Sequence, residues 1–186
     1  VSFMGAGYPN RRLAFAQLLD FDLGIFGSEW DGDPLLSGRV RLGGRRVTTE
    51  ESVKIFNAAG VNLNLHSSMS PRELVPAGDF VNPRTFELAL CGAFQLVSDR
   101  ALLPELFAED ELARFSTMGE LREKLAYYLN RPEERAALAE RARIRALAEH
   151  TYGRRMERLL AFTAERFPDW PRGRDEEQTA LVGLPQ

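Results

Sequence analysis

Cysteine and histidine are nearly absent from this chain. Its 186 residues include a single cysteine, Cys91, and two histidines, His66 and His150. One cysteine excludes an internal disulfide, and so few thiol and imidazole groups argue against a structural zinc site. Small and apolar neighbours favour a packing role for Cys91 over a nucleophilic one. We therefore expect neither a metal nor a cofactor.

The chain also lacks a dominant charge and a long apolar run. It has 24 basic and 27 acidic side chains, a formal charge of −3, so no global field favours nucleic acid or an anionic membrane. No apolar stretch is long enough to span a bilayer, and no export signal opens the chain. We expect a cytoplasmic protein that binds neither nucleic acid nor membrane. Its 44% hydrophobic content suffices for one substantial core.

Segments typical of strands alternate with segments of helical periodicity. The expected strands, rich in Val, Leu, Ile and Phe, lie at residues 1–4, 23–26, 61–65, 94–98 and 112–115. Such an order predicts a Rossmann-like α/β fold, a parallel sheet with helices on both faces. Residues 28–46 are predicted to form a loop with a short edge strand, and residues 66–80 a long polar loop.

Local signals mark where the helices begin and where the domain ends. Capping boxes are predicted at Thr48 with Glu51 and at Thr117 with Glu120. A final helix at about 152–167 closes a domain that we place at residues 1–168. Beyond it, residues 169–186 lack a sustained period and are predicted to form a disordered tail.

The most informative stretch is VNPRTFE, which leads from the long polar loop into a short helix. A helix that begins at Asn82 and Pro83 points unpaired N–H groups and the positive end of its dipole at an anion. Arg84 offers a guanidinium and Thr85 a hydroxyl to phosphate, while Glu87 can accept hydrogen bonds from ribose hydroxyls. The competing interpretation is an ordinary helix start with a surface ion pair between Arg84 and Glu87.

Other candidates lie where expected strands end, the edge at which parallel sheets bind ligands. Gly5 and Gly7 follow the first strand, either to face a phosphate or to permit a tight turn. Arg11 and Arg12 fall in the first helical turn, where a cation is unfavourable unless an anion is bound. We expect one of them to bind phosphate and the other to face solvent. His66 either contacts the ligand or is a buried histidine with a satisfied ring.

The strings VNPRTFELALCGAFQLVSD, LNLH and RALAEHTYGRRMERLL resemble the glycosyltransferase-like family of spore maturation protein CgeB. The likeness covers roughly residues 1–167. It implies the C-terminal, donor-binding half of a two-domain GT-B glycosyltransferase. Such enzymes bind their donor without a metal and pass a sugar from a nucleoside diphosphate to an acceptor held mostly by the other domain.

The resemblance also implies roles for individual residues. Glu87 matches the acidic residue that holds the ribose, and Asp79 stands eight positions earlier, where glutamate is usual. That departure leaves the stereochemical outcome open. The implied donor contacts are, for the diphosphate, Gly5, Gly7, Arg11, Arg12, Arg84 and Thr85, and for the sugar, His66, Asp79 and Asn82. We assign no catalytic base, because the missing domain can supply it.

We further expect this chain to be a fragment that lacks an N-terminal domain and turns over little alone. Leu159, Leu160 and Phe162 on the final helix would then be exposed and let the chain dimerise. One alternative is a catalytically silent GT-B-like binding module in a surface or spore-coat assembly. Another is a receiver- or flavodoxin-like domain, against which the lack of clustered acids after the first strand argues.

Overall fold

The computed structural model of the protein describes residues 1–168. The chain divides into two compact units, Val1–Ala148 and Glu149–Gln186. The second unit contains helix α7 (Tyr152–Arg166), which the sequence analysis places in one domain with the rest. The tail predicted at residues 169–186 lies outside the described residues.

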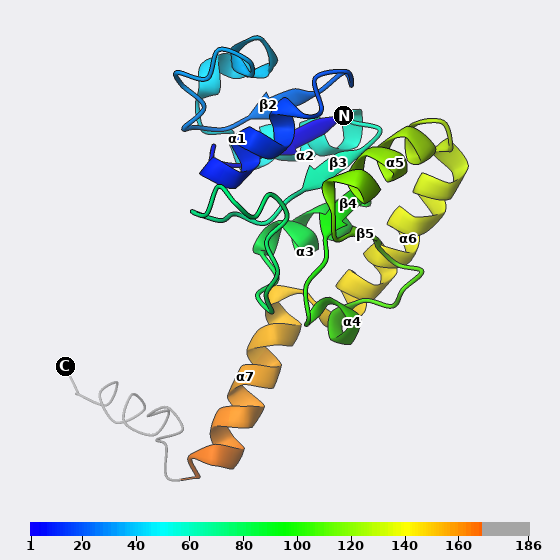
Figure 1. Cartoon of the computed structure of the whole chain (residues 1–186). Coiled ribbons are helices and arrows are strands. Elements are labelled where there is room, and N and C mark those ends of the chain that lie inside the picture. Colours follow the sequence, from blue (N-terminus) through cyan, green and yellow to red (C-terminus); the bar gives the residue numbers. More distant parts are fainter. Residues whose placement is uncertain (169–186) are drawn as a thin grey trace, which may run out of the picture. The chain divides into compact units, whose positions relative to one another are not determined.

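A five-stranded sheet forms the centre of the first unit (Figure 1). Its strands pair in the order β2-β1-β3-β4-β5, and every pairing is parallel. The strands are β1 (Ser2–Met4), β2 (Gly24–Phe26), β3 (Asn62–Asn64), β4 (Gln95–Ser98) and β5 (Ala113–Phe115). The register aligns one residue from each strand in a row: Ile25, Phe3, Leu63, Leu96 and Ala113. The predicted parallel α/β sheet is therefore confirmed.

Helices α1 to α4 lie between successive strands, as predicted, and α5 and α6 follow the last strand. They are α1 (Pro9–Ala16), α2 (Thr49–Ala58), α3 (Pro83–Leu90), α4 (Leu103–Leu106), α5 (Met118–Leu129) and α6 (Pro132–Glu149). The edge strand expected within residues 28–46 is wrong. That segment contains two short 3-10 helices, Ser37–Arg39 and Leu42–Gly44, and its contact with the sheet is a single bridge between Ile25 and Val40.

Successive strand residues point to opposite sides of the sheet, and helices cover both sides. On one face Phe3 and Leu63 pack in a cluster with Phe15, Leu121 and Leu125, which come from α1 and α5. On the other face, Met4 packs against Phe56 of α2 and Leu88 of α3, and Val97 packs against residues of α3 and α6. This arrangement confirms the prediction of helices on both sides.

One of the two predicted capping boxes is complete. Thr48 and Glu51 bond reciprocally, with Glu51 N–H donating to Thr48 Oγ1 and Thr48 N–H donating to Glu51 Oε2. At α5, Thr117 Oγ1 accepts from Glu120 N–H, but the Glu120 carboxylate accepts from Ser116 N–H at 2.7 Å. The second box is therefore only half formed, because the carboxylate reaches one residue further back.

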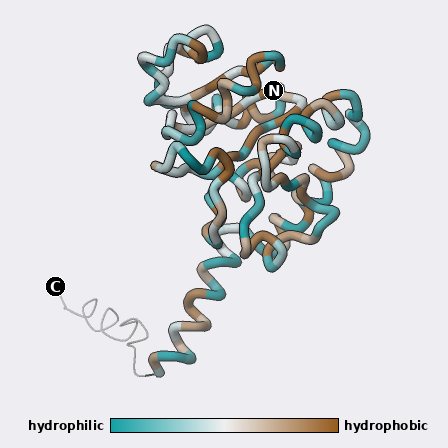
Figure 2. Tube along the Cα trace, in the orientation of Figure 1, coloured by the Kyte–Doolittle hydropathy of each residue, from teal (hydrophilic) through white to brown (hydrophobic). Residues whose placement is uncertain are grey.

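Helix α7 has an apolar surface of its own. Figure 2 shows hydrophobic and hydrophilic positions alternating along it. Leu159, Leu160 and Phe162 are 55%, 62% and 62% exposed, which agrees with the exposure predicted for them. Dimerisation through this helix stays a prediction.

Replacing Phe15 by alanine tests the core that supports the sheet. Phe15 is fully buried and its ring lies 4.6 Å from that of Phe3 and 5.8 Å from that of Trp30. We expect Phe15→Ala to lower the free energy of unfolding by about 3–5 kcal/mol in urea titrations. Leu13→Ala, on the same helix at a side chain that is 47% exposed, should cost less than about 1 kcal/mol. Equal losses in the two variants would contradict this account.

Candidate functional site

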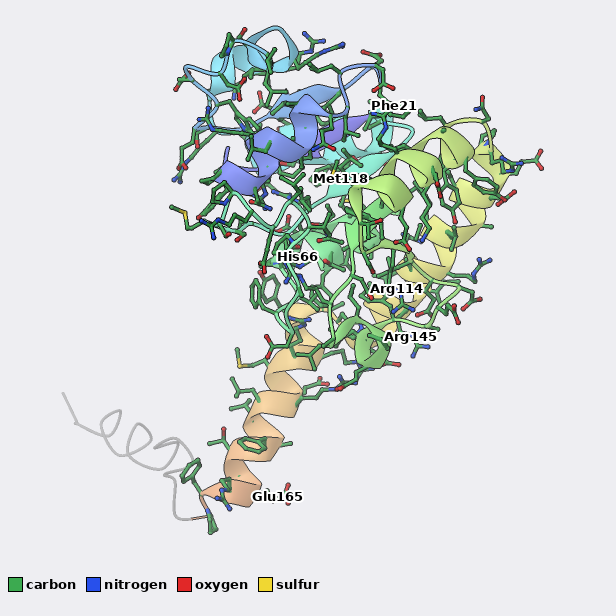
Figure 3. All side chains as sticks on the ribbon, in the orientation of Figure 1. Phe21, His66, Arg114, Met118, Arg145 and Glu165 are labelled. Carbon is green, nitrogen blue, oxygen red and sulfur yellow. The ribbon has the colours of Figure 1, made fainter. Side chains whose placement is uncertain are left out.

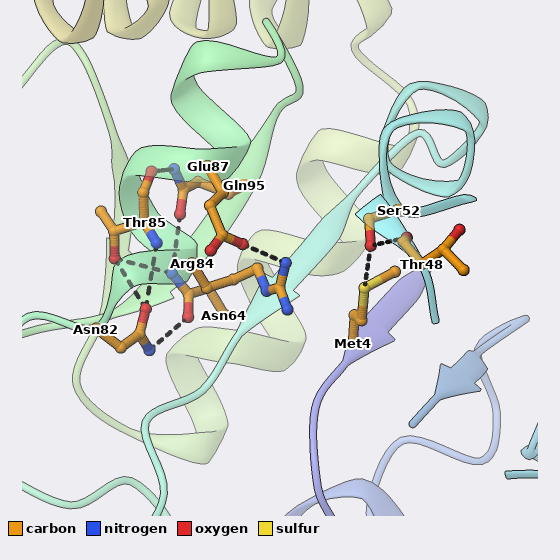
Figure 4. A network of polar contacts seen from close by, with 9 residues as sticks. All are labelled: Met4, Thr48, Ser52, Asn64, Asn82, Arg84, Thr85, Glu87 and Gln95. Atoms are coloured by element: carbon orange, nitrogen blue, oxygen red, sulfur yellow. Dashed lines mark hydrogen bonds and ion pairs between the residues drawn. The ribbon is translucent and has the colours of Figure 1, made fainter. Parts of the chain in front are cut away.

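Four polar side chains join the start of α3 to the sheet (Figure 4). Asn64 of β3 donates from Nδ2 to Thr85 Oγ1 (2.9 Å) and to Gln95 Oε1 (3.0 Å), and it accepts from Asn82 Nδ2 at 2.8 Å. Gln95 of β4 donates in turn to the Thr85 carbonyl at 2.9 Å. Asn64, Thr85 and Gln95 are each at most 2% exposed. The first turn of α3 is thus held from below by a buried, satisfied network.

This network changes the interpretation of Asn82 and Thr85. Asn82 caps α3, because its Oδ1 accepts from Thr85 N–H at 3.2 Å. The Thr85 side chain is fully buried, and its hydroxyl donates to Asn82 Oδ1 at 3.3 Å. We predicted a sugar contact for Asn82 and a phosphate contact for Thr85. In this structure the polar atoms of both side chains are bonded to protein and shape the helix start, and the two ligand contacts stay predictions.

His66 is buried directly after β3 (Figure 3) and both of its ring nitrogens are occupied. Nε2 accepts from Asn82 N–H at 3.1 Å, which places the ring proton on Nδ1, 2.8 Å from Ser98 Oγ. Burial, and then the charges of Arg100 and Arg11, lower the pKa of His66 to about 3. The geometry fits the second of our two interpretations, a neutral histidine with a satisfied ring, and this ring helps to hold the α3 cap.

Arg84 and Glu87 are the charged side chains near the start of α3, with Arg84 on the first turn and Glu87 one turn further on. They form the ion pair of the competing interpretation, and the Arg84 guanidinium lies 5.0 Å from the centre of the Phe56 ring. The two side chains keep 27% and 49% of their surface exposed. A surface pair of this kind is weak, so an anion and a diol can replace its contacts at little cost. Both residues therefore remain within reach of a ligand at the helix start.

The glycine loop after β1 is packed against the turn that follows β2. Gly5 and Gly7 donate their N–H groups to Phe26 O (2.9 Å) and Ser28 O (3.0 Å). A Cβ at Gly7 would lie 1.9 Å from the carbonyl oxygen of Glu29. The tight-turn interpretation thus has a structural basis at Gly7, while a phosphate contact stays a prediction for both glycines.

Arg11 and Arg12 use their guanidinium groups to hold loops. Arg11 donates to Leu65 O at 2.8 and 3.0 Å and to Ala6 O at 3.1 Å, and burial lowers its pKa to about 10. Arg12 donates to Gly7 O at 2.8 Å and also to the carbonyls of Glu29 and Asp31. We expected one of the two to face solvent; Arg12 is half-buried, and two of its guanidinium bonds lie in exposed surroundings. The positive charge of Arg84 also lowers the Arg11 pKa, by less than burial does.

Sequence reasoning missed two residues that fix the long loop at 66–80. Asn10 is fully buried in α1 and donates to His66 O (2.9 Å) and Leu74 O (3.3 Å), while its Oδ1 accepts from Ser68 N–H (2.8 Å). Arg100, after β4, donates to Ala77 O at 2.7 Å. An asparagine next to Pro9 at a helix start is a signal that could have pointed to Asn10 from the sequence. Nothing in the neighbouring sequence distinguishes Arg100. Asp79 is exposed on this loop, and its charge acts on Arg100.

Comparison with known proteins assigns the family. The sequence profile of the glycosyl transferase-like family matches residues 11–161, more than half of the chain. The chain belongs to this family. The resemblance stated from the sequence strings is therefore confirmed, and so is the Rossmann-like α/β fold. Within residues 1–168, this glycosyl transferase-like chain has no helix long and apolar enough to cross a membrane.

One relative and several solved structures are similar to this glycosyl transferase-like chain. Spore protein CgeB of Bacillus subtilis (strain 168) is 29% identical over 146 residues, which cover 73% of this chain and 45% of that protein. The chain thus spans less than half the length of the curated relative it matches. Sucrose-phosphate synthase of Thermosynechococcus elongatus has a TM-score of 0.66 at 14% identity, covering 91% of this chain and 46% of that one. Anabaena Alr3699/HepE, in complex with UDP and glucose, has a TM-score of 0.64 at 15% identity, covering 89% and 48%.

Gly7→Ala tests the close approach of the two loops. The added methyl group would overlap the Glu29 carbonyl, so we expect a loss of about 2 kcal/mol in the free energy of unfolding. Gly38→Ala is the control, because a Cβ there meets nothing within 4 Å. An unchanged urea midpoint for Gly7→Ala would show that the loops are not packed as described.

The buried neutral state of His66 predicts a pH dependence of stability. The folded-state pKa of about 3 lies below the unfolded value of 6.5, so protons bind the unfolded chain more readily. Stability from this group is therefore complete above about pH 6.5 and declines as the pH falls toward 3, by at most about 1.4 kcal/mol per pH unit. Urea titrations from about pH 7.5 to about pH 4.5 should show a steeper decline for the wild type than for His66→Gln. Parallel declines would contradict the assignment.

Proposed function

We propose that this domain binds the nucleoside diphosphate sugar donor of a glycosyltransferase. The observation that carries the proposal is the start of α3, held by the Asn64 network at the carboxyl edge of a parallel sheet, with a partly exposed Arg84 on its first turn and an exposed Glu87 one turn further on. Membership of the glycosyl transferase-like family makes a sugar nucleotide the fitting ligand. The complexes of the similar Anabaena protein with UDP and with UDP-glucose support the same choice.

In this proposal the diphosphate lies against the α3 start. The helix dipole and Arg84 stabilise it, and Arg11 adds its positive field from beside the glycine loop. Glu87 accepts hydrogen bonds from the ribose. As the bond to the sugar breaks, negative charge grows on the leaving diphosphate, and preorganised donors of this kind stabilise that charge more than the ground state. The domain thereby favours departure of the nucleotide.

The remaining parts of the proposal rest on the family. The acceptor and a catalytic base belong to a second domain, in line with solved structures of which this chain covers 46% and 48%. Metal-independent donor binding, low activity of the isolated chain and a cytoplasmic location stay predictions. A place for Asp79 beside the donor sugar, eight positions before Glu87, also stays a prediction.

Calorimetric titration with UDP and with GDP tests the proposal. We expect the wild type to bind one of them, and Arg84→Ala or Glu87→Ala to weaken that binding about 10- to 100-fold, as the loss of a charge-assisted hydrogen bond predicts. Arg131→Ala is a matched control, because Arg131 also pairs with a glutamate three residues on, Glu134, and lies over an aromatic ring, that of Tyr127. It should bind like the wild type.

The alternative is a binding module that has lost its chemistry. It would retain the fold but ignore both nucleotides, and the aspartate at position 79 is the observation that favours it. A folded wild type that binds neither nucleotide would favour this alternative, whereas nucleotide affinity that is equal in the wild type, Arg84→Ala and Glu87→Ala would speak against the donor site.

A further inference from the structure

Among residues 1–168, Arg100 is a buried cation without an ionic partner. It lies directly after β4 and is 7% exposed. Its Nη1 donates to Ala77 O at 2.7 Å, while Nε has no hydrogen-bond partner among residues 1–168. Within those residues no carboxylate lies within 4.0 Å of the guanidinium. Because an unpaired buried charge is costly, a guanidinium in this state favours an anion from outside the chain.

A cavity of about 250 Å³ adjoins Arg100 at the carboxyl ends of β4 and β5. Its walls are residues 75–78 of the long loop, residues 99–101 and Ser116. The volume is several times that of a single water molecule, so a ligand group of several atoms fits in it. The cavity lies on the same edge of the sheet as the start of α3.

The other charged groups around this cavity leave the Arg100 guanidinium available to bind an anion. Asp99, which lines it, is paired with Arg114 at 3.6 Å. Glu120 is bonded to Ser116 N–H on the cavity wall. Asp79 attracts Arg100 from beyond ion-pair distance and is exposed on a loop. The charges of Arg100 and Arg11 both lower the pKa of His66, after the larger effect of burial.

We propose that Arg100 and this cavity bind a second anionic group of a substrate, a carboxylate or a phosphate, separate from the donor diphosphate. A guanidinium recognises either group through charge-assisted hydrogen bonds, and the unpartnered Nε of Arg100 can donate one of them once the side chain adjusts. The anion is carried by the transferred sugar or by the acceptor. The inference rests on the proposed function only in placing the anion on a substrate of a glycosyltransferase.

Calorimetry with UDP-glucuronic acid and UDP-glucose tests whether the transferred sugar carries the anion. If the transferred sugar carries the anion, the wild type binds the acidic donor at least about tenfold more tightly, and Arg100→Gln, which removes the positive charge, loses that preference. UDP alone should bind both proteins equally, which separates the anion site from the donor site. Thermal unfolding checks that the variant is folded, and Arg100→Lys, which keeps the charge, should retain part of the preference.

A second arm titrates glucuronate and inorganic phosphate, with and without saturating UDP. Binding that Arg100→Gln abolishes would place the anion on the acceptor. If no probe binds in an Arg100-dependent way, the inference is overturned, even where UDP binds. If UDP fails to bind, the proposed function fails, and the titrations without nucleotide still decide whether Arg100 holds an anion.

Asp79→Asn distinguishes an anion site from a simple counterion. Removing the competing carboxylate should strengthen anion binding at Arg100 by a few fold. If Arg100 serves only to balance Asp79, the variant will be less stable and its affinity for the probes will not rise.

Discussion

The hydrogen bonds of Asn64 are the constraint on which the candidate site depends. This buried side chain on β3 contacts the cap residue of α3, the hydroxyl of Thr85 and the amide of Gln95 on β4. An unsatisfied amide at this depth would cost several times the net gain from a typical hydrogen bond. The network is therefore favourable only when the helix start and both strands are in register. It fixes the position and direction of the start of α3, which carries Arg84 and Glu87.

Guanidinium groups hold the loops around that turn. Arg11 links the glycine loop to the end of β3, Arg12 links it to the turn after β2, and Arg100 holds the long loop at Ala77. Each guanidinium donates hydrogen bonds to backbone carbonyls at the carboxyl edge of the sheet. In the described part of the chain, the loops there make no regular strand-to-strand hydrogen bonds. The hydrogen bonds of these guanidinium groups stabilise the protein, and their positive charge remains at the carboxyl edge of the sheet. Structural support and attraction for an anion thus come from the same side chains, which is consistent with a site for phosphorylated ligands.

The sequence predicted the fold well because the signals were local and periodic. Apolar strands, the Thr48 capping box and Pro83 at a helix start each depend on a few neighbouring residues, and all appear in the structure. The edge strand within residues 28–46 was wrong, because two short helical turns satisfy the backbone there instead. Single side chains were harder to predict. Thr85 and Asn82 have the chemistry of ligand contacts, but whether their polar atoms face solvent or Asn64 depends on a residue far from them in the sequence.

The family and the fold favour a sugar-nucleotide site at the carboxyl edge, and the central claim is that the start of α3 receives the diphosphate. A crystal structure of the chain with UDP tests it most directly. The account predicts phosphate oxygens within hydrogen-bond distance of the Arg84 guanidinium and of the first N–H groups of α3, with ribose hydroxyls on Glu87. A nucleotide bound at another edge of the sheet, with Arg84 and Glu87 still paired to each other, would contradict it.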